Sequence, residues 1–188
     1  MHHLFIISGP SGVGKTTVVK ELLKRFPELR TSVTYTTRER RPSAEEDKTM
    51  HYITKEAFLK KQQAGDFLEW AEYNNNYYGT ARSETESTLR TNPILMNIDV
   101  QGARQIADHF PENSTTIFLV PESSGQMAER IKRRATVTEE ELAARLATAE
   151  MELRKKDTFD YQIINKEARL KETVESVAQI IQTVLRST

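Results

Sequence analysis

The chain has 188 residues, and its 27 lysines and arginines balance its 27 aspartates and glutamates, so the formal net charge is zero. A zero net charge excludes a protein that coats nucleic acid through a large positive excess. The absence of cysteine excludes disulfides and thiolate metal sites, and no apolar run approaches the roughly 18 residues of a membrane span. We therefore expect one cytoplasmic domain, monomeric or homodimeric, with no nucleic-acid and no membrane partner.

Apolar runs and helical patterns alternate along most of the chain. Strands buried on both faces are predicted where the apolar runs stand, at residues 4–8, 93–99, 115–120 and 161–165. Helices are predicted where apolar residues recur with helical spacing, at 15–26, 101–109, 124–134, 138–156 and 168–186. This alternation favours an α/β fold, in which a parallel sheet carries helices on both faces.

Two segments depart from the alternation. Short alternating stretches at 32–36 and 67–72, together with a polar loop at 42–49, predict a small inserted α+β subdomain. Residues 122–156 are almost wholly helical in pattern and rich in charge. They predict a helical hairpin that can move relative to the sheet.

Residues 9–16, GPSGVGKT, match the phosphate-binding motif G-x-x-x-x-G-K-[ST] at every position. The motif follows a predicted strand and opens a predicted helix, which is the context that its chemistry requires. Glycines let backbone N–H groups close around phosphate oxygens, and the helix N-terminus adds partial positive charge. Lys15 would reach the β- and γ-phosphates of a nucleotide, and the Thr16 hydroxyl would ligate Mg²⁺. The motif therefore predicts a nucleoside triphosphate site.

Three further groups of residues allow both a functional and a purely structural interpretation. Asp99 ends an apolar strand, so it either serves the phosphate-binding loop or simply caps the next helix. Arg38 and Arg41 would converge on one phosphate if the chain turns between them, or else they solvate an edge strand. Glu69 would accept the two adjacent N–H donors of guanine, which adenine lacks, or it is an exposed strand residue opposite a core Trp70. The four histidines have no ligand spacing, so we expect no metal site built from protein side chains alone.

These motifs, taken in order, resemble the guanylate kinase family over essentially the whole chain. The matching segments are SGPSGVGKTT (8–17), SVTYTTRERR (32–41), LEWAEYNNNYYGT (68–80), IDVQGA (98–103), RIKRRATVTEEELAARLATAEMEL (130–153) and DYQIIN (160–165). The resemblance implies a single domain (1–188) with a P-loop NTPase core around a parallel five-stranded sheet, formed by residues 1–32, 83–123 and 157–188. It also implies a GMP-binding α+β insert at 33–82 and a helical lid at 124–156. The implied reaction is phosphoryl transfer from ATP to GMP or dGMP, with Mg²⁺ as a cofactor.

The resemblance also assigns roles to individual residues of this chain. For ATP it implies Gly9, Pro10, Ser11, Gly12, Val13, Gly14, Lys15, Thr16 and Thr17, with Asn165 near the adenine. For the GMP phosphate it implies Arg38, Arg41 and Tyr78, and for the guanine edge it implies Thr34, Glu69, Thr80 and Asp99. The catalytic charges that it implies are those of Lys15 and of two lid residues, Arg134 and Arg145.

Five positions depart from the family's usual pattern: Met50, Asn97, Asn75 and Ala135 (commonly glycine) and Glu122 (commonly proline). Two of them bear on the site. Met50 stands where the family commonly has tyrosine, and Asn97 stands where it commonly has an acidic residue, which affects how Mg²⁺ or water is placed. A thioether donates no hydrogen bond to a phosphate. Either the grip on GMP is weakened, or the hydroxyl of Tyr52, on the same strand face, replaces the missing phenol. We favour the weakened grip, because Tyr52 also fits an aromatic core position.

Two other functions fit parts of the pattern. One is a kinase of the same fold that acts on a different small phosphate acceptor, and the guanine-reading residue types at Thr34, Glu69 and Thr80 argue against it. The other is a non-catalytic guanylate-kinase-like module that binds proteins, and the complete phosphate-binding loop argues against it.

Overall fold

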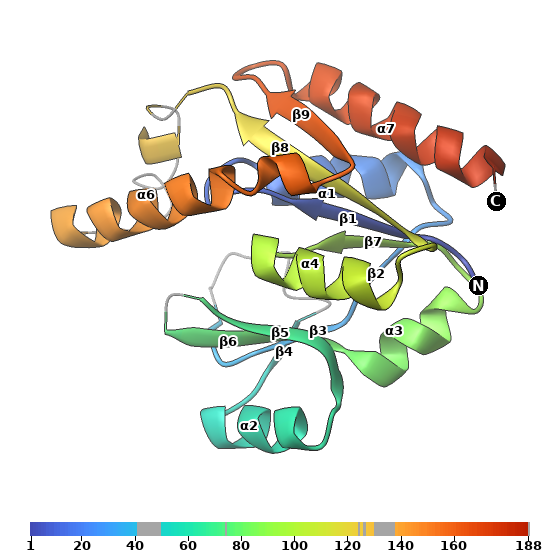
Figure 1. Ribbon diagram of the computed structural model, residues 1–188, viewed down its shortest axis with the longest axis vertical. Coiled ribbons are helices and arrows are strands. Elements are labelled where there is room, and N and C mark those ends of the chain that lie inside the picture. Colours follow the sequence, from blue (N-terminus) through green and yellow to red (C-terminus); the bar gives the residue numbers. More distant parts are fainter. Residues whose placement is uncertain (41–49, 74, 124, 126, 130–137, 188) are drawn as a thin grey trace.

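Two β-sheets organise the part of the chain that the computed structural model describes, which is residues 1–40, 50–73, 75–123, 125, 127–129 and 138–187 (Figure 1). The larger one, here called the core sheet, has five parallel strands in the spatial order β2-β7-β1-β8-β9. Their bounds are Arg30–Thr31, Ile94–Asn97, Leu4–Ser8, Ser114–Pro121 and Tyr161–Asn165, respectively. The prediction of an α/β fold around a parallel five-stranded sheet is confirmed.

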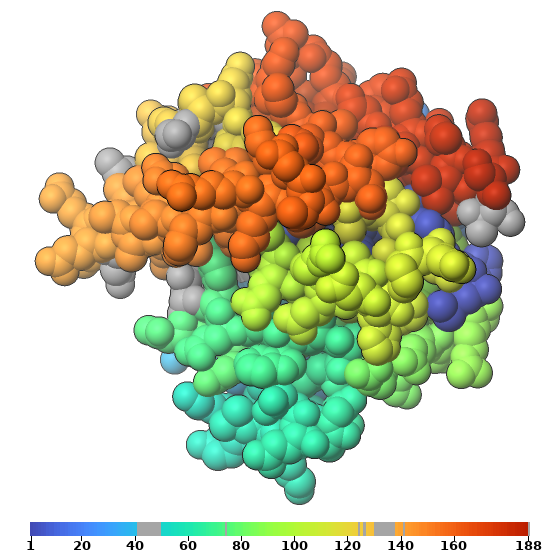
Figure 2. Space-filling model, viewed as in Figure 1, coloured from blue at the N-terminus to red at the C-terminus, as the bar shows by residue number. Residues whose placement is uncertain are grey.

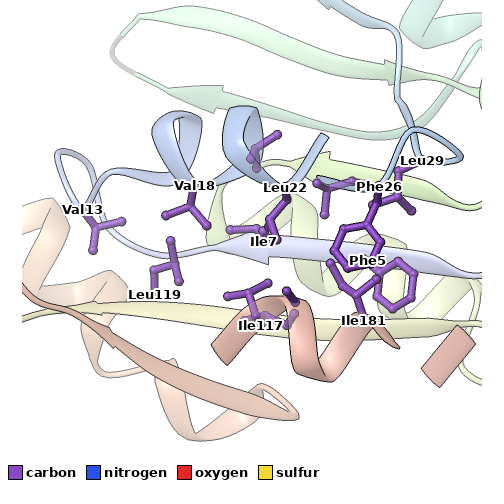
Figure 3. Close-up of a cluster of buried hydrophobic side chains, with 14 residues drawn as sticks. Phe5, Ile7, Val13, Val18, Leu22, Phe26, Leu29, Ile117, Leu119 and Ile181 are labelled. Atoms are coloured by element: carbon purple, nitrogen blue, oxygen red, sulfur yellow. The ribbon is translucent and has the colours of Figure 1, made fainter. Parts of the chain in front are cut away.

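The central strand β1 is buried along its whole length, and its successive side chains enter two different hydrophobic cores. Phe5 and Ile7 point into the first core, between the sheet and the helices α1 and α7 (Figure 3). Leu4 and Ile6 point into the second core, on the face that α4 covers. Because side chains alternate along a strand, an uninterrupted apolar run is what a strand between two layers of helices requires.

Helices cover both faces of the core sheet. The helices of the described chain, including α2 of the insert, have these bounds: Lys15–Arg25 for α1, Lys55–Gln63 for α2, Arg82–Leu89 for α3, Val100–His109 for α4, Glu139–Leu153 for α6 and Leu170–Ser187 for α7. A 3₁₀ turn follows α6 at Lys156–Thr158. The sequence predicted neither α2 nor α3, since each buries only one or two side chains. The helix predicted at 138–156 ends earlier, and the one predicted at 124–134 falls largely outside the described residues.

The smaller sheet, here called the insert sheet, has the spatial order β4-β3-β6-β5. Its strands are Met50–Tyr52, Thr34–Thr36, Asn76–Ala81 and Phe67–Tyr73, respectively, and all four lie between residues 33 and 82. Helix α4 lies between the two sheets in Figure 1. Gln105 ties α4 to the insert sheet, because its amide accepts from the Trp70 N–H at 3.4 Å and donates to the Trp70 carbonyl at 3.1 Å.

The burial of β5 corrects one prediction. Trp70 is 38% exposed and is not a core residue, whereas Glu69 is only 5% exposed. The cause is an irregularity in the pairing of β5 with β6, between Phe67 and Glu69. A bulge of this kind shifts the alternation of side chains by one residue, so the face that each one occupies is exchanged.

Helix α6, here called the lid helix, starts away from the body of the molecule and runs back toward it (Figure 1). Its first turns project beyond the rest of the surface in Figure 2. In the described ranges, no helix combines the length and the apolar character needed to cross a bilayer.

Candidate active site

The phosphate-binding loop joins the end of β1 to the start of α1. Gly9, Gly12 and Gly14 have φ values of 138°, 79° and 101°, a region that residues with a Cβ rarely adopt. At Gly9, a Cβ would in addition stand 2.5 Å from the carbonyl oxygen of Leu119 in β8. The path of the loop therefore depends on glycine at these positions.

Two contacts hold the loop from behind. The side chain of Val13 is buried in the first core (Figure 3). Asn165, at the end of β9, donates from its amide to the carbonyl of Val13 at 2.7 Å and accepts from the hydroxyl of Thr173 in α7 at 2.9 Å. The structure thus gives Asn165 a role in holding the loop, and its contact with adenine stays a prediction.

Lys15 lies against the loop that precedes it. Its ammonium donates to the carbonyl oxygens of Gly9 and Pro10, and the residue lines a pocket together with Ser11. Thr17 is exposed. The charge of Lys15 is therefore delivered to the pocket by the loop itself.

Residues at the carboxyl end of β7 face the same pocket. Asp99 accepts from the backbone N–H groups of Gln101 at 2.8 Å and Gly102 at 3.0 Å, so it caps α4 while it also lines the pocket. Asn97 donates from its amide to the hydroxyl of Thr16 at 3.2 Å. The carboxyl end of β7 thus brings polar oxygens beside the phosphate-binding loop.

The chemistry of these oxygens fits a magnesium ion. Hydroxyl, amide and carboxylate oxygens of Thr16, Asn97 and Asp99 are the hard ligands that Mg²⁺ prefers. Among the described residues there is no group of three or more His, Cys, Asp or Glu side chains that would hold a metal alone. Kinase magnesium sites need no such group, since one or two protein oxygens and the phosphates suffice.

The insert sheet aligns three predicted residues in one cross-strand row. Thr34 of β3 pairs with Thr80 of β6, and Thr80 pairs with Glu69 of β5. The Thr80 hydroxyl donates to Glu69 Oε1 at 2.6 Å. Thr34 and Glu69 line the same pocket as the phosphate-binding loop. The row therefore presents two hydroxyls followed by one carboxylate.

Burial defines the chemistry of Glu69. Burial raises the pKa of its carboxyl to about 7, although the Thr80 hydroxyl favours the charged form, and the nearby Asp99 adds to the rise. A Cβ at Gly102 would stand 2.5 Å from Glu69 Oε2, so the glycine leaves the space that the carboxyl occupies. A carboxylate kept this dry binds strongly to any ligand that brings it N–H donors.

The other end of the pocket is lined by Arg38, Met50 and Tyr78. Arg38 donates to the hydroxyl oxygen of Tyr52 at 3.3 Å, and that hydroxyl lies 3.8 Å from the sulfur of Met50. Tyr52 thus places a hydroxyl beside Met50 and Arg38, which a relocated grip requires, and the choice between a weakened and a relocated grip stays a prediction. Arg41 lies outside the described residues.

Of the two arginines predicted in the lid, one lies within the described residues. Arg145 lies in the middle of α6, whereas Arg134 falls outside the described part. Burial raises the pKa of the Tyr73 hydroxyl, and the positive charge of Arg145 opposes that shift. Arg145 therefore lies within electrostatic reach of Tyr73, which lines the pocket.

Two residues of the pocket, Tyr73 and Glu152, were not predicted. Tyr73 ends β5, and Glu152 lies in the last turn of α6. Burial raises the pKa of Glu152, while the Lys15 ammonium and the backbone N–H of Ser11 lower it. No motif marks either residue. The spacing of seven between Arg145 and Glu152, which puts both on one helix face, is the one sequence signal that bears on them.

The pattern that describes the guanylate kinase family matches residues 1–184. The chain belongs to the guanylate kinase family. Among its relatives, the guanylate kinase of Thermotoga maritima is 41% identical over 181 residues, which cover 96% of this chain and 86% of that one. The guanylate kinase of Prochlorococcus marinus subsp. pastoris is 40% identical over 181 residues, which cover 96% and 97% of the two chains.

Solved structures agree with membership of the guanylate kinase family. The crystal structure of guanylate kinase from Anaplasma phagocytophilum aligns with a TM-score of 0.77 at 28% identity, covering 97% of this chain and 85% of that one. Shikimate kinase from Bacteroides thetaiotaomicron aligns with a TM-score of 0.55 at 12% identity, covering 96% and 98% of the two chains, and shows the fold alone. A fold shared at this level does not by itself say what is bound.

Proposed function

We propose that this enzyme of the guanylate kinase family transfers the γ-phosphoryl group of ATP to GMP, giving ADP and GDP. One observation supports the choice of acceptor: the buried Glu69 carboxylate lies in one pocket with a complete phosphate-binding loop. A carboxylate only accepts hydrogen bonds, and guanine offers two adjacent donors at N1 and N2. Adenine lacks this pair of donors and would leave the buried carboxylate unpaired, which is costly.

Charge and position account for the rest of the proposed mechanism. Arg38 would bind the phosphate of GMP together with Tyr78 and Arg41, while Lys15 would bind the phosphates of ATP. Phosphoryl transfer needs little covalent chemistry from the protein, and its developing charge is stabilised by positioned cations. The lid residues Arg134 and Arg145 would supply that charge when α6 lies over the site.

Mg²⁺ would be held by the Thr16 hydroxyl, with oxygens of Asn97 and Asp99 in support. When bound, the ion neutralises negative charge on the phosphates. In this chain, Asn97 contributes an amide and no charge. We therefore propose that the substrate phosphates hold most of the ion, and that the hydrogen bond from Asn97 keeps the Thr16 hydroxyl turned toward it.

Movement of the insert (33–82) and the lid (124–156) onto the core would exclude water from the site. Exclusion matters because water competes with GMP as the acceptor of the phosphoryl group. Since guanine is read at its base edge, the proposal extends to dGMP. A cytoplasmic location and a monomeric or homodimeric state are also proposed, and light scattering tests the latter.

A panel of acceptors tests the proposal. ADP release is measured with ATP, Mg²⁺ and, in turn, GMP, dGMP, AMP, CMP and a sugar phosphate. We expect turnover with GMP and dGMP that exceeds all the others by at least a hundredfold. Higher turnover with another acceptor would support a different kinase of this fold, and no turnover above that of the Lys15→Ala control would support a protein-binding module.

A further inference from the structure

Three buried side-chain polar atoms in the described part of the chain have no well-aligned hydrogen-bond partner, and two of them lie in the active-site pocket, where the Ser11 side chain approaches Tyr73 without meeting hydrogen-bond geometry. These two are the hydroxyl oxygen of Tyr73 and Oε2 of Glu152, whereas the third belongs to Thr85 in α3. Buried polar atoms are almost always paired in native proteins, because an unpaired one costs free energy. Two such atoms in one pocket therefore call for an explanation.

The two atoms are complementary. A phenol hydroxyl is a donor, and a carboxylate oxygen is an acceptor. They also lie within electrostatic reach of each other: after burial and the nearby Ser11 side chain, the charge of Glu152 is the next influence on the pKa of Tyr73. Both residues converge on Ser11, since its backbone N–H favours the charged form of Glu152. The two side chains thus bring the end of β5 and the end of α6 to the same point of the phosphate-binding loop.

The geometry of α6 links this pair to Arg145. Seven residues separate Arg145 from Glu152, which places them on one helix face about 10.5 Å apart along the axis. Ala149 lies between them on that face and is fully buried. The face that carries all three residues is therefore turned toward the body of the enzyme. A contact that fixes Glu152 therefore also fixes the helix face from which Arg145 extends.

Resting on the proposed function, we propose that Tyr73 and Glu152 are positioning residues that pair, hydroxyl to carboxylate, when the insert and the lid close over both substrates. The pair aligns the face of α6 so that Arg145 points at the phosphoryl group in transfer. Neither side chain touches the reacting atoms. Tyr73 belongs to the part that binds GMP and Glu152 to the lid, so the pair forms only when both parts are in place.

A double-mutant cycle tests the pairing. Tyr73→Phe, Glu152→Ala and the double variant are compared for kcat, for the KM of each substrate and for melting temperature. We expect each single variant to lower kcat about tenfold, with the KM for GMP within twofold of wild type, and the double variant to be no slower than the slower single one. Tyr73→Phe should melt at or above the wild-type temperature, because it removes an unpaired buried hydroxyl; a merely structural role would lower that temperature and leave kcat unchanged.

Matched controls are Tyr77→Phe, on the neighbouring strand, and Glu150→Ala, on the exposed side of α6; both should keep wild-type kcat. In an Arg145→Ala background, Tyr73→Phe should have no further effect, and this comparison decides the matter if Glu152→Ala does not fold. Multiplicative losses in the double variant would overturn the pairing, as would an unchanged kcat for Tyr73→Phe. A lowered KM for ATP in Glu152→Ala would overturn it too, since Glu152 would then compete with phosphate for Lys15. Failure of the wild-type enzyme to phosphorylate GMP would instead refute the proposed function.

Discussion

Removal of the Tyr52 hydroxyl is expected to weaken the binding of GMP through its phosphate. Arg38 donates to that hydroxyl at 3.3 Å, and the hydroxyl lies 3.8 Å from the sulfur of Met50. Because a thioether is a weak acceptor, the hydroxyl proton can turn to a phosphate oxygen at little cost. A hydrogen bond to a charged group contributes about 1.5–3 kcal/mol, so Tyr52→Phe should raise the KM for GMP by roughly tenfold to a hundredfold.

The assay is the initial rate of ADP release at saturating ATP over a range of GMP concentrations. Tyr35→Phe is a matched control, since Tyr35 stacks on His51 and lines a different pocket of the insert. Met50→Tyr should leave the KM for GMP unchanged or raise it, because a second phenol would crowd the first. The relocation is refuted if Tyr52→Phe changes nothing while Met50→Tyr lowers the KM, which is the outcome of a weakened grip.

Three further variants test other parts of the site. Lys15→Ala should abolish turnover and leave the melting temperature unchanged, because the lysine contributes charge and no core packing; turnover within tenfold of wild type would contradict its role. Burial raises the pKa of Glu69 to about 7, so in the free enzyme kcat/KM for GMP should rise with pH up to about 7 and then level off, a profile that Glu69→Gln should lose. Because this pKa is higher in the folded chain than in the unfolded chain, the free energy of unfolding is greatest below the ordinary pKa of glutamate and falls as the pH rises through 7. Without ligand, Glu69→Gln should therefore melt at a higher temperature than wild type at pH 8 and not at pH 5. Gly102→Ala should displace the Glu69 carboxyl and raise the KM for GMP at least tenfold, and an unchanged ratio of GMP to AMP activity would show that the carboxyl needs no such space.

The sequence could predict the phosphate-binding loop and the core sheet because both are coded by neighbouring residues. A buried strand needs an unbroken apolar run, as at residues 4–8, and the loop needs its glycines at fixed spacing. Helices α2 and α3 escaped prediction because each buries only one or two side chains. Their position is decided by the sheets beside them, which a local pattern does not reveal.

Glu69 shows where prediction from the sequence ends. Its residue type suggested a guanine contact, but strict alternation put Trp70 in the core, and the bulge that reverses the two faces has no local signal. Tyr73 and Glu152 went unnoticed for a different reason. They are 79 positions apart in the chain (152 − 73), and only the folded arrangement of insert, lid and loop brings them to one pocket.

Strand β5 forms an outer edge of the insert sheet, and an outer strand offers its backbone to any other chain that can pair with it. Gln105 occupies that edge at Trp70, where its amide makes both hydrogen bonds of a neighbouring strand. When α4 moves away from the insert sheet, Gln105 leaves with it and the edge of β5 is open to another chain. Substitutions or solution conditions that loosen α4 should therefore favour edge-to-edge aggregation of the folded protein.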